Sequence, residues 1–259
     1  MINLLQIELM KLRKYATFWI LCSLFSGLFI LSVYGQNKSF IKLGGGPVDL
    51  LAGSFSFPNV WDNVAFTYSW FVIFLSVFMI ISVSNEFTFR TGRQHIIDGM
   101  KRLDFLHSKL WLGICLSTAA TVLFILTCLF FGAINGGGNP ILHSEKIIYV
   151  FLFTVNYLMF ATLLTFLIRR AGLGIILFLA YLVVEFLFMQ FINWKFSTFM
   201  GSLLPLQASD ELLPNPLMRT LGNATGMQSA PVMYCVGMSL FYISSYYFIL
   251  RYKLLKSDL

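Results

Sequence analysis

Charged residues are scarce in this chain of 259 residues. Asp, Glu, Lys and Arg together make up 11% of the sequence, whereas soluble domains carry about 25%. Hydrophobic residues make up 58%, and aromatic residues alone make up 17%. This composition is more apolar than the core of a soluble domain of this size would need, which argues against a soluble globular domain. We therefore expect an integral membrane protein.

Sequence motifs for common chemistries are also missing. The chain has no G-x-x-x-x-G-K-[ST] phosphate loop, no H-E-x-x-H metal motif and no G-x-S-x-G nucleophile elbow. Its three histidines are scattered over loops on both sides of the expected topology, and its four cysteines fall inside apolar runs without a C-x-x-C pair. We expect no catalytic residue, no metal site and no cofactor bound by this chain.

Long apolar runs are the most abundant feature. Six runs are about twenty residues long and show no alternation of polar and apolar positions, which predicts membrane-spanning helices rather than the strands of a barrel. The expected fold is an all-α integral membrane protein with a single transmembrane domain over residues 1–259. The predicted spans are 16–34, 64–83, 111–134, 147–168, 171–192 and 231–250.

The basic residues are distributed unevenly between the connections. Thirteen of the eighteen lysines and arginines precede the first span, follow the sixth, or lie in the connections after the second and fourth spans. Because basic residues accumulate on the cytoplasmic side, both termini and the connection after the second span are expected in the cytoplasm. This asymmetry accounts for the net charge of +7, so we expect no nucleic-acid partner.

Two segments outside the spans carry apolar residues. Residues 2–14 alternate apolar and polar faces at helical spacing, which predicts an amphipathic helix lying in the cytoplasmic interface. Residues 193–230 hold many large apolar side chains between three prolines, which predicts short external helices rather than a solvated loop. These helices could cap an outward gate or form a packed plug that closes the bundle, and both roles stay open.

Glu185 is the only acidic residue well inside a predicted span. A charge at that depth costs several kcal/mol unless it is paired, hydrated or protonated, so we expect the side chain to face the bundle interior. Asn156 and Gln190 are its candidate partners. Two interpretations remain: a residue lining the substrate path or a subunit interface, or a structural carboxyl that is protonated or hydrogen-bonded.

The most distinctive polar stretch is 84–110, SNEFTFRTGRQHIIDGMKRLDFLHSKL, between the second and third spans. Thr91 and Gln94 have the spacing of a capping box, which predicts a short helix over 92–98. This helix would lie outside the bilayer with one face available to a partner.

The same stretch resembles the corresponding loop in permease subunits of type-2 ATP-binding-cassette (ABC) exporters. That family has an E-x-x-x-G-T-x-R-x-x-L-like run, then a basic residue and a lysine; the matching residues here are Glu86, Arg90, Thr91, Gly92, Arg93, Lys101, Arg102 and Lys109. The opening residues 8–14, ELMKLRK, also resemble the start of that family. The order of threonine and glycine is reversed here, and the usual proline before the basic pair is absent.

The resemblance implies a division of labour between chains. The helix 92–98 would dock in a groove of a separate cytoplasmic ABC ATPase, which is present in two copies and binds ATP and Mg. A second permease chain, identical or related, would complete one substrate pathway within the membrane lipid. The chain would thus be a non-enzymatic exporter subunit of the bacterial inner membrane. The coupling residues implied are Glu86, Arg90, Thr91, Gly92, Arg93, Ile96, Ile97, Lys101 and Arg102.

Two other functions remain open. A membrane scaffold or accessory subunit would dock a cytoplasmic partner through the same loop and transport nothing. A self-contained secondary transporter is the third possibility, although the chain lacks an internal repeat and has a single intramembrane carboxylate.

Overall fold

The computed structural model describes residues 8, 10–13, 15–38, 55–89, 102–136, 138–196, 199–214 and 230–256, which form helices and turns without any strand. Six of the helices are long and apolar enough to cross a membrane. They are α2 (Ala16–Asn37), α3 (Val60–Thr88), α5 (Arg102–Ile134), α6 (Lys146–Ile168), α7 (Ala171–Phe196) and α10 (Val232–Lys256). The prediction of an all-α, multi-pass membrane protein is confirmed at this level.

Each predicted apolar run coincides with one of these helices. The largest difference is at α5, which begins at Arg102, nine residues before the predicted span. Its first turns are amphipathic rather than uniformly apolar, and they bury Phe105 and Leu106 against the rest of the bundle. A hydropathy window detects the apolar part of such a helix and misses the amphipathic extension.

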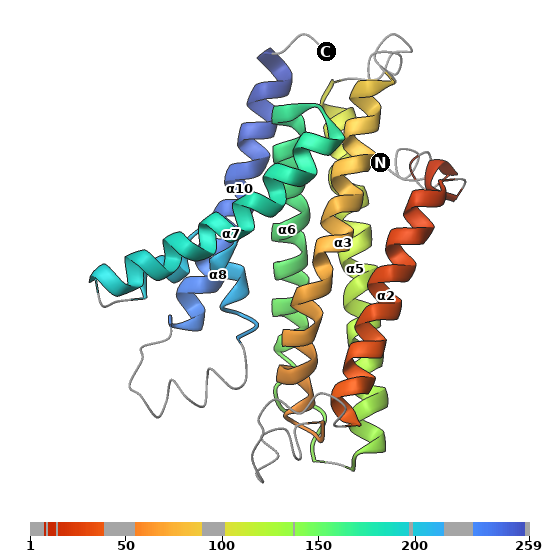
Figure 1. Ribbon diagram of the computed structural model, residues 1–259, viewed down its shortest axis with the longest axis vertical. Coiled ribbons are helices and arrows are strands. Elements are labelled where there is room, and N and C mark those ends of the chain that lie inside the picture. The colour runs from red at the N-terminus through yellow and green to blue at the C-terminus, as the bar shows by residue number, and fades with distance from the viewer. Residues whose placement is uncertain are drawn as a thin grey trace.

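The helices α3 and α6 form the centre of the bundle. More than half of the most apolar stretch of each is buried, against about a sixth in α2, α7 and α10. In Figure 1, α2 flanks α3 on one side and α10 flanks α6 on the other, while α7 leaves the bundle obliquely. We call the end at the top of Figure 1, where α3 ends and α5 begins, the upper end of the bundle.

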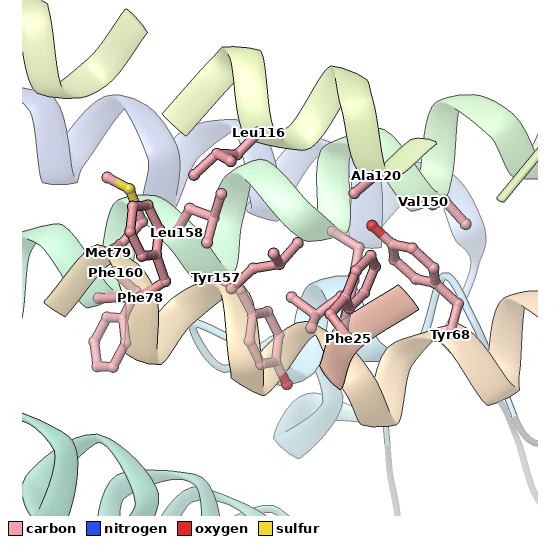
Figure 2. Packing of buried hydrophobic residues seen from close by; sticks show 14 of the residues in the cluster. Phe25, Tyr68, Phe78, Met79, Leu116, Ala120, Val150, Tyr157, Leu158 and Phe160 are labelled. Atoms are coloured by element: carbon pink, nitrogen blue, oxygen red, sulfur yellow. The ribbon is translucent and has the colours of Figure 1, made fainter. Parts of the chain in front are cut away.

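Aromatic rings and aliphatic side chains pack together and fill the centre of the bundle (Figure 2). Tyr68 of α3 meets Phe25, Phe29 and Phe124 nearly edge-on, with ring centroids 5.6–5.8 Å apart. Its hydroxyl shares a 2.7 Å hydrogen bond with Thr154 of α6. Because lipid tails are as apolar as the side chains, such packing and interhelical hydrogen bonds, rather than transfer from water, hold membrane helices together.

A two-residue turn directs α7 away from α6. Arg169 ends α6 in the left-handed conformation, with φ of 57° and ψ of 16°, and α7 begins two residues later. The Arg169 guanidinium lies over the ring of Phe87, 5.5 Å from its centroid. The turn is therefore attached to the end of α3 as well as to α6.

Two short helices lie between α7 and α10. They are the 3-10 helix η1 (Met200–Leu203) and the single-turn α8 (Gln207–Asp210). We refer to residues 199–214, which contain both, as the η1–α8 segment. It packs against α6, α7 and α10.

Candidate functional site

Four ionisable side chains meet at the upper end of the bundle. The Lys109 ammonium on α5 lies 2.8 Å from Glu8 Oε2 and 2.8 Å from Glu86 Oε1 on α3. The Lys11 ammonium lies 3.0 Å from the same Glu86 oxygen and 3.6 Å from Glu8 Oε1. We call Glu8, Lys11, Glu86 and Lys109 the upper-end ionic cluster. It joins the N-terminal residues to the two helices that flank the 90–101 stretch.

The cluster is largely closed to solvent. The Lys109 side chain is 1% exposed and both carboxylate side chains are 7% exposed, whereas Lys11 is 39% exposed. The two positive and two negative charges sum to zero. Each buried charge also has an opposite charge within 2.8 Å. Buried ion pairs often add little net stability, but removing one partner leaves an uncompensated charge. The arrangement therefore depends on the presence of every buried member.

Local structure explains why these residues meet. The chain between the helical residues 10–13 and α2 is extended at Tyr15, with φ of −97° and ψ of 104°. The Tyr15 hydroxyl accepts a 2.8 Å hydrogen bond from Asn85 Nδ2. This contact fixes the N-terminal residues beside the last turn of α3, next to Glu86.

The predicted coupling residues divide into two groups. Glu86 belongs to the upper-end ionic cluster, and Arg102 is the first residue of α5. The others, and the helix predicted over 92–98, lie outside the described residues: Arg90, Thr91, Gly92, Arg93, Ile96, Ile97 and Lys101. The described ends of α3 and α5 nevertheless flank that stretch and are joined by the Glu86–Lys109 contact.

The sequence-based list of coupling residues omitted Glu8, Lys11 and Lys109. A signal for Lys109 was present, because it stands two positions before the third apolar run while Glu86 follows the second run closely. Ionisable groups of opposite sign at the same membrane depth on consecutive antiparallel spans are expected to pair. No comparable signal identified Glu8, whose approach depends on the bend at Tyr15.

The other predicted site residues surround the η1–α8 segment. Glu185 Oε1 on α7 accepts a 2.9 Å hydrogen bond from the Leu206 backbone N–H. Asn156 on α6 donates through Nδ2 to the Pro205 carbonyl at 2.8 Å and to Ser209 Oγ at 2.9 Å. Glu185 and Asn156 therefore hold the same segment from two helices. Neither the described contacts of Asn156 nor those of the exposed Gln190 include a hydrogen bond to Glu185.

Two tyrosine hydroxyls, one on α6 and one on α10, also hold the η1–α8 segment. The Tyr157 hydroxyl donates to Asp210 Oδ1 at 2.7 Å, and the Tyr242 hydroxyl of α10 donates to the Leu203 carbonyl at 3.1 Å. Leu206, with no exposed surface, lies in the main core of the bundle. These contacts favour the packed-plug interpretation of this part of the chain.

Gly201→Ala is expected to destabilise the protein by about 1–3 kcal/mol. A Cβ at this position would lie 2.5 Å from the Met189 carbonyl oxygen and 2.7 Å from Asn193 Oδ1, which accepts the Gly201 N–H. Thermal unfolding of the detergent-solubilised protein measures the effect. Gly237→Ala is the matched control, because no atom lies within 4 Å of its Cβ. Equal unfolding temperatures for the two variants would contradict the close approach of η1 to α7.

The lower end of the bundle carries a separate ionic group. Asp62 contacts the His143 ring at 2.9 Å and the Lys146 ammonium at 3.0 Å, and Lys146 also donates to the Leu212 carbonyl at 3.2 Å. His107 does not belong to this group; its Nε2 atom shares a 3.2 Å hydrogen bond with the Tyr247 hydroxyl. Within the described part of the chain, no three His, Cys, Asp or Glu residues are grouped to hold a metal ion.

Comparison with known proteins gives no assignment: no family model, curated protein or solved structure matches the chain. The upper-end ionic cluster and the contacts of the η1–α8 segment are therefore the basis for a functional proposal.

Proposed function

We propose that this chain is the membrane-spanning permease subunit of an ATP-driven exporter of the type-2 ABC kind, coupled to a separate cytoplasmic ATPase. The observation that carries the proposal is the upper-end ionic cluster. Lys109 binds Glu86 and Glu8 at 2.8 Å each, directly beside the stretch that resembles the coupling loop of that family.

The cluster gives the loop a mechanical connection to the bundle. A force applied to the loop that connects α3 and α5 would move both helices together, because Glu86 and Lys109 join the two helices close to the ends of that loop. Phe87 and Phe105 extend this connection to α6 through Phe166, with ring centroids 5.2 and 6.1 Å away. Closure of an ATPase pair would then tilt the helices as one body, which is the motion that rigid-body alternating access requires.

The loop supplies the groups that such docking needs. Arg90, Arg93 and Arg102 would meet carboxylates or carbonyls of the ATPase, and Ile96 and Ile97 would fill an apolar pocket. By the positive-inside rule we expect this loop and both termini in the cytoplasm. The family resemblance implies a bacterial inner membrane.

A second permease chain, identical or related, would complete the pathway. In one chain α2 and α7 leave large apolar side chains exposed, among them Trp19, Leu31, Val184 and Leu187. These faces are available to lipid and to a second permease chain, and the pathway would lie between the two chains.

Co-purification tests the proposal. The chain is expressed together with the proteins encoded beside its gene and purified in mild detergent, as the natural sequence and as an Arg93→Glu, Ile97→Asp double variant. We expect the natural chain to retain the ATPase and the double variant to bind it about thirtyfold more weakly or worse, which corresponds to about 2 kcal/mol. Lys38→Glu, a charge reversal at an exposed position beyond the other end of α2, is the matched control and should retain the ATPase.

Unfolding temperature and elution volume of the permease show whether the double variant remains folded. A folded double variant that keeps the ATPase fully would remove the loop from the coupling role. If the natural chain binds no ATPase, the exporter assignment fails and the scaffold and secondary-transporter alternatives take its place.

A further inference from the structure

Three carboxyl groups gather where the η1–α8 segment meets α7. Glu185 comes from α7, and Asp210 and Glu211 come from the segment itself. Glu185 is 4% exposed. Within the described residues, no lysine, arginine or histidine forms an ion pair with any of the three. The charge arrangement is thus opposite to that of the upper-end ionic cluster, where each carboxylate has a cation.

Three buried oxygen atoms at this place have no hydrogen-bond partner among the described residues. They are Glu185 Oε2, Asn156 Oδ1 and the hydroxyl oxygen of Tyr246. The carboxyl of Glu185 is directed at the segment, since its other oxygen accepts the Leu206 N–H at 2.9 Å. An ionised carboxylate with an unpartnered oxygen in a buried position is costly, whereas a carboxylic acid there removes the charge altogether.

We propose that Glu185 and Asp210 form a proton-binding site, and that proton uptake seats the η1–α8 segment against α6 and α7. A proton fits these observations better than a metal ion, because the described acidic groups are not arranged to ligate one ion together. The inference concerns this chain alone and does not rest on the proposed transport function.

Proton uptake is compatible with the hydrogen bonds already formed. A proton from water binds Oε2 of Glu185, and the carboxylate becomes a neutral carboxylic acid while Oε1 still accepts the Leu206 N–H. At Asp210, a proton on Oδ2 leaves Oδ1 free to accept from the Tyr157 hydroxyl. Uptake at both sites removes the repulsion among the three carboxyls without breaking a contact of the seated segment.

Most of the described side chains around the site are uncharged at neutral pH. Tyr157 faces it from α6, and Tyr181 faces Glu185 from one turn earlier on α7. The helix α10 contributes Tyr242, Tyr246 and, near Glu211, Cys235. Among the described residues, Lys146 contacts the segment as a cation: it binds the Leu212 carbonyl and pairs with Asp62.

Burial gives the site a pH range. It raises the pKa of Asp210 from 3.8 to about 7, against the hydrogen bond from Tyr157 and with added repulsion from Glu185 and Glu211. Burial also raises the pKa of Glu211, against the hydrogen bond from Ser202. A carboxyl with a raised pKa favours the seated state most strongly when it is protonated. Seating is therefore strongest below pH 3.8, weakens as the pH rises from 3.8 to about 7, and changes no further above that range.

Hydrogen–deuterium exchange of peptides covering residues 199–214 tests the inference on the natural chain in lipid nanodiscs. After division by the intrinsic exchange rate at each pH, we expect protection to fall by about tenfold per pH unit between about pH 5 and 7 for one titrating group. Infrared difference spectra should show that the C=O stretch of a protonated carboxylic acid disappears as the pH rises over the same range. A pH-independent protection in the natural chain would overturn the proposal.

A neutral double variant, Glu185→Gln with Asp210→Asn, assigns the effect to these two residues. We expect it to remain protected at both ends of the pH range and to lack the infrared change. Glu145→Gln, which neutralises an exposed carboxyl, is the control and should behave as the natural chain. If a folded double variant keeps the natural pH dependence, the proton is bound elsewhere and the proposal is wrong.

Discussion

Replacing Lys109 by methionine is expected to destabilise the protein by about 3–5 kcal/mol. The substitution conserves much of the side-chain length but removes the ammonium group that lies 2.8 Å from both buried carboxylates, Glu8 and Glu86. The partly exposed Lys11 also contacts these carboxylates and remains in place. The measurement is chemical or thermal unfolding of the purified protein in detergent, followed by tryptophan fluorescence. The same variant should weaken ATPase binding if the proposed coupling role is correct.

Two further variants separate the ionic contribution from lost packing. Lys11→Met removes a charge that is 39% exposed, and should cost about 1 kcal/mol or less. Adding Glu86→Gln to Lys109→Met removes one of the stranded carboxylates, so it should restore part of the lost stability. If Lys109→Met costs no more than Lys11→Met, the upper-end ionic cluster does not hold the helices together.

Asn156→Leu is the second substitution with a large expected effect, about 2–4 kcal/mol. Leucine has nearly the same volume, but it removes both donors to the η1–α8 segment and leaves the Pro205 carbonyl and Ser209 Oγ without them. Each buried polar group that loses its partner costs about 1–3 kcal/mol. The variant should release the segment, so limited proteolysis is expected to cut within residues 199–214 faster than in the natural chain.

Asn135→Leu provides the matched control for this substitution. Asn135 is exposed directly after the lower end of α5, and its described side-chain hydrogen bond is donated to the Phe131 carbonyl in the last turn of that helix. Its replacement should change stability by no more than about 0.5 kcal/mol. Equal protease resistance of the Asn156→Leu and natural proteins would mean that the segment is held by its apolar contacts alone.

Hydrophobicity predicted the six long helices because each needs about twenty apolar residues in sequence, which is a local property. The same argument predicted that Glu185 is buried, since an intramembrane carboxylate avoids lipid. It did not predict what Glu185 binds. The acceptor oxygen meets the Leu206 backbone N–H, and a backbone donor is present at nearly every position, so no residue type marks it in the sequence.

Helix geometry explains why Gln190, the second predicted partner of Glu185, does not contact it. Gln190 is five residues after Glu185, which on an α-helix places it about 140° around the axis. When Glu185 faces the segment, Gln190 consequently points outward, and it is exposed. The Glu8 contact was unpredictable for a different reason, because it depends on the break in the helix at Tyr15 rather than on a pattern within one helix.

The hydrogen bond between Tyr68 and Thr154 has a consequence for biosynthesis. The two residues are 86 positions apart, so at about 5–20 residues per second Thr154 leaves the ribosome roughly 4–17 s after Tyr68. Leu206 follows Glu185 by 21 positions, a delay of roughly 1–4 s. The nascent α3 thus spends the longer time in the bilayer with its hydroxyl lacking the native partner.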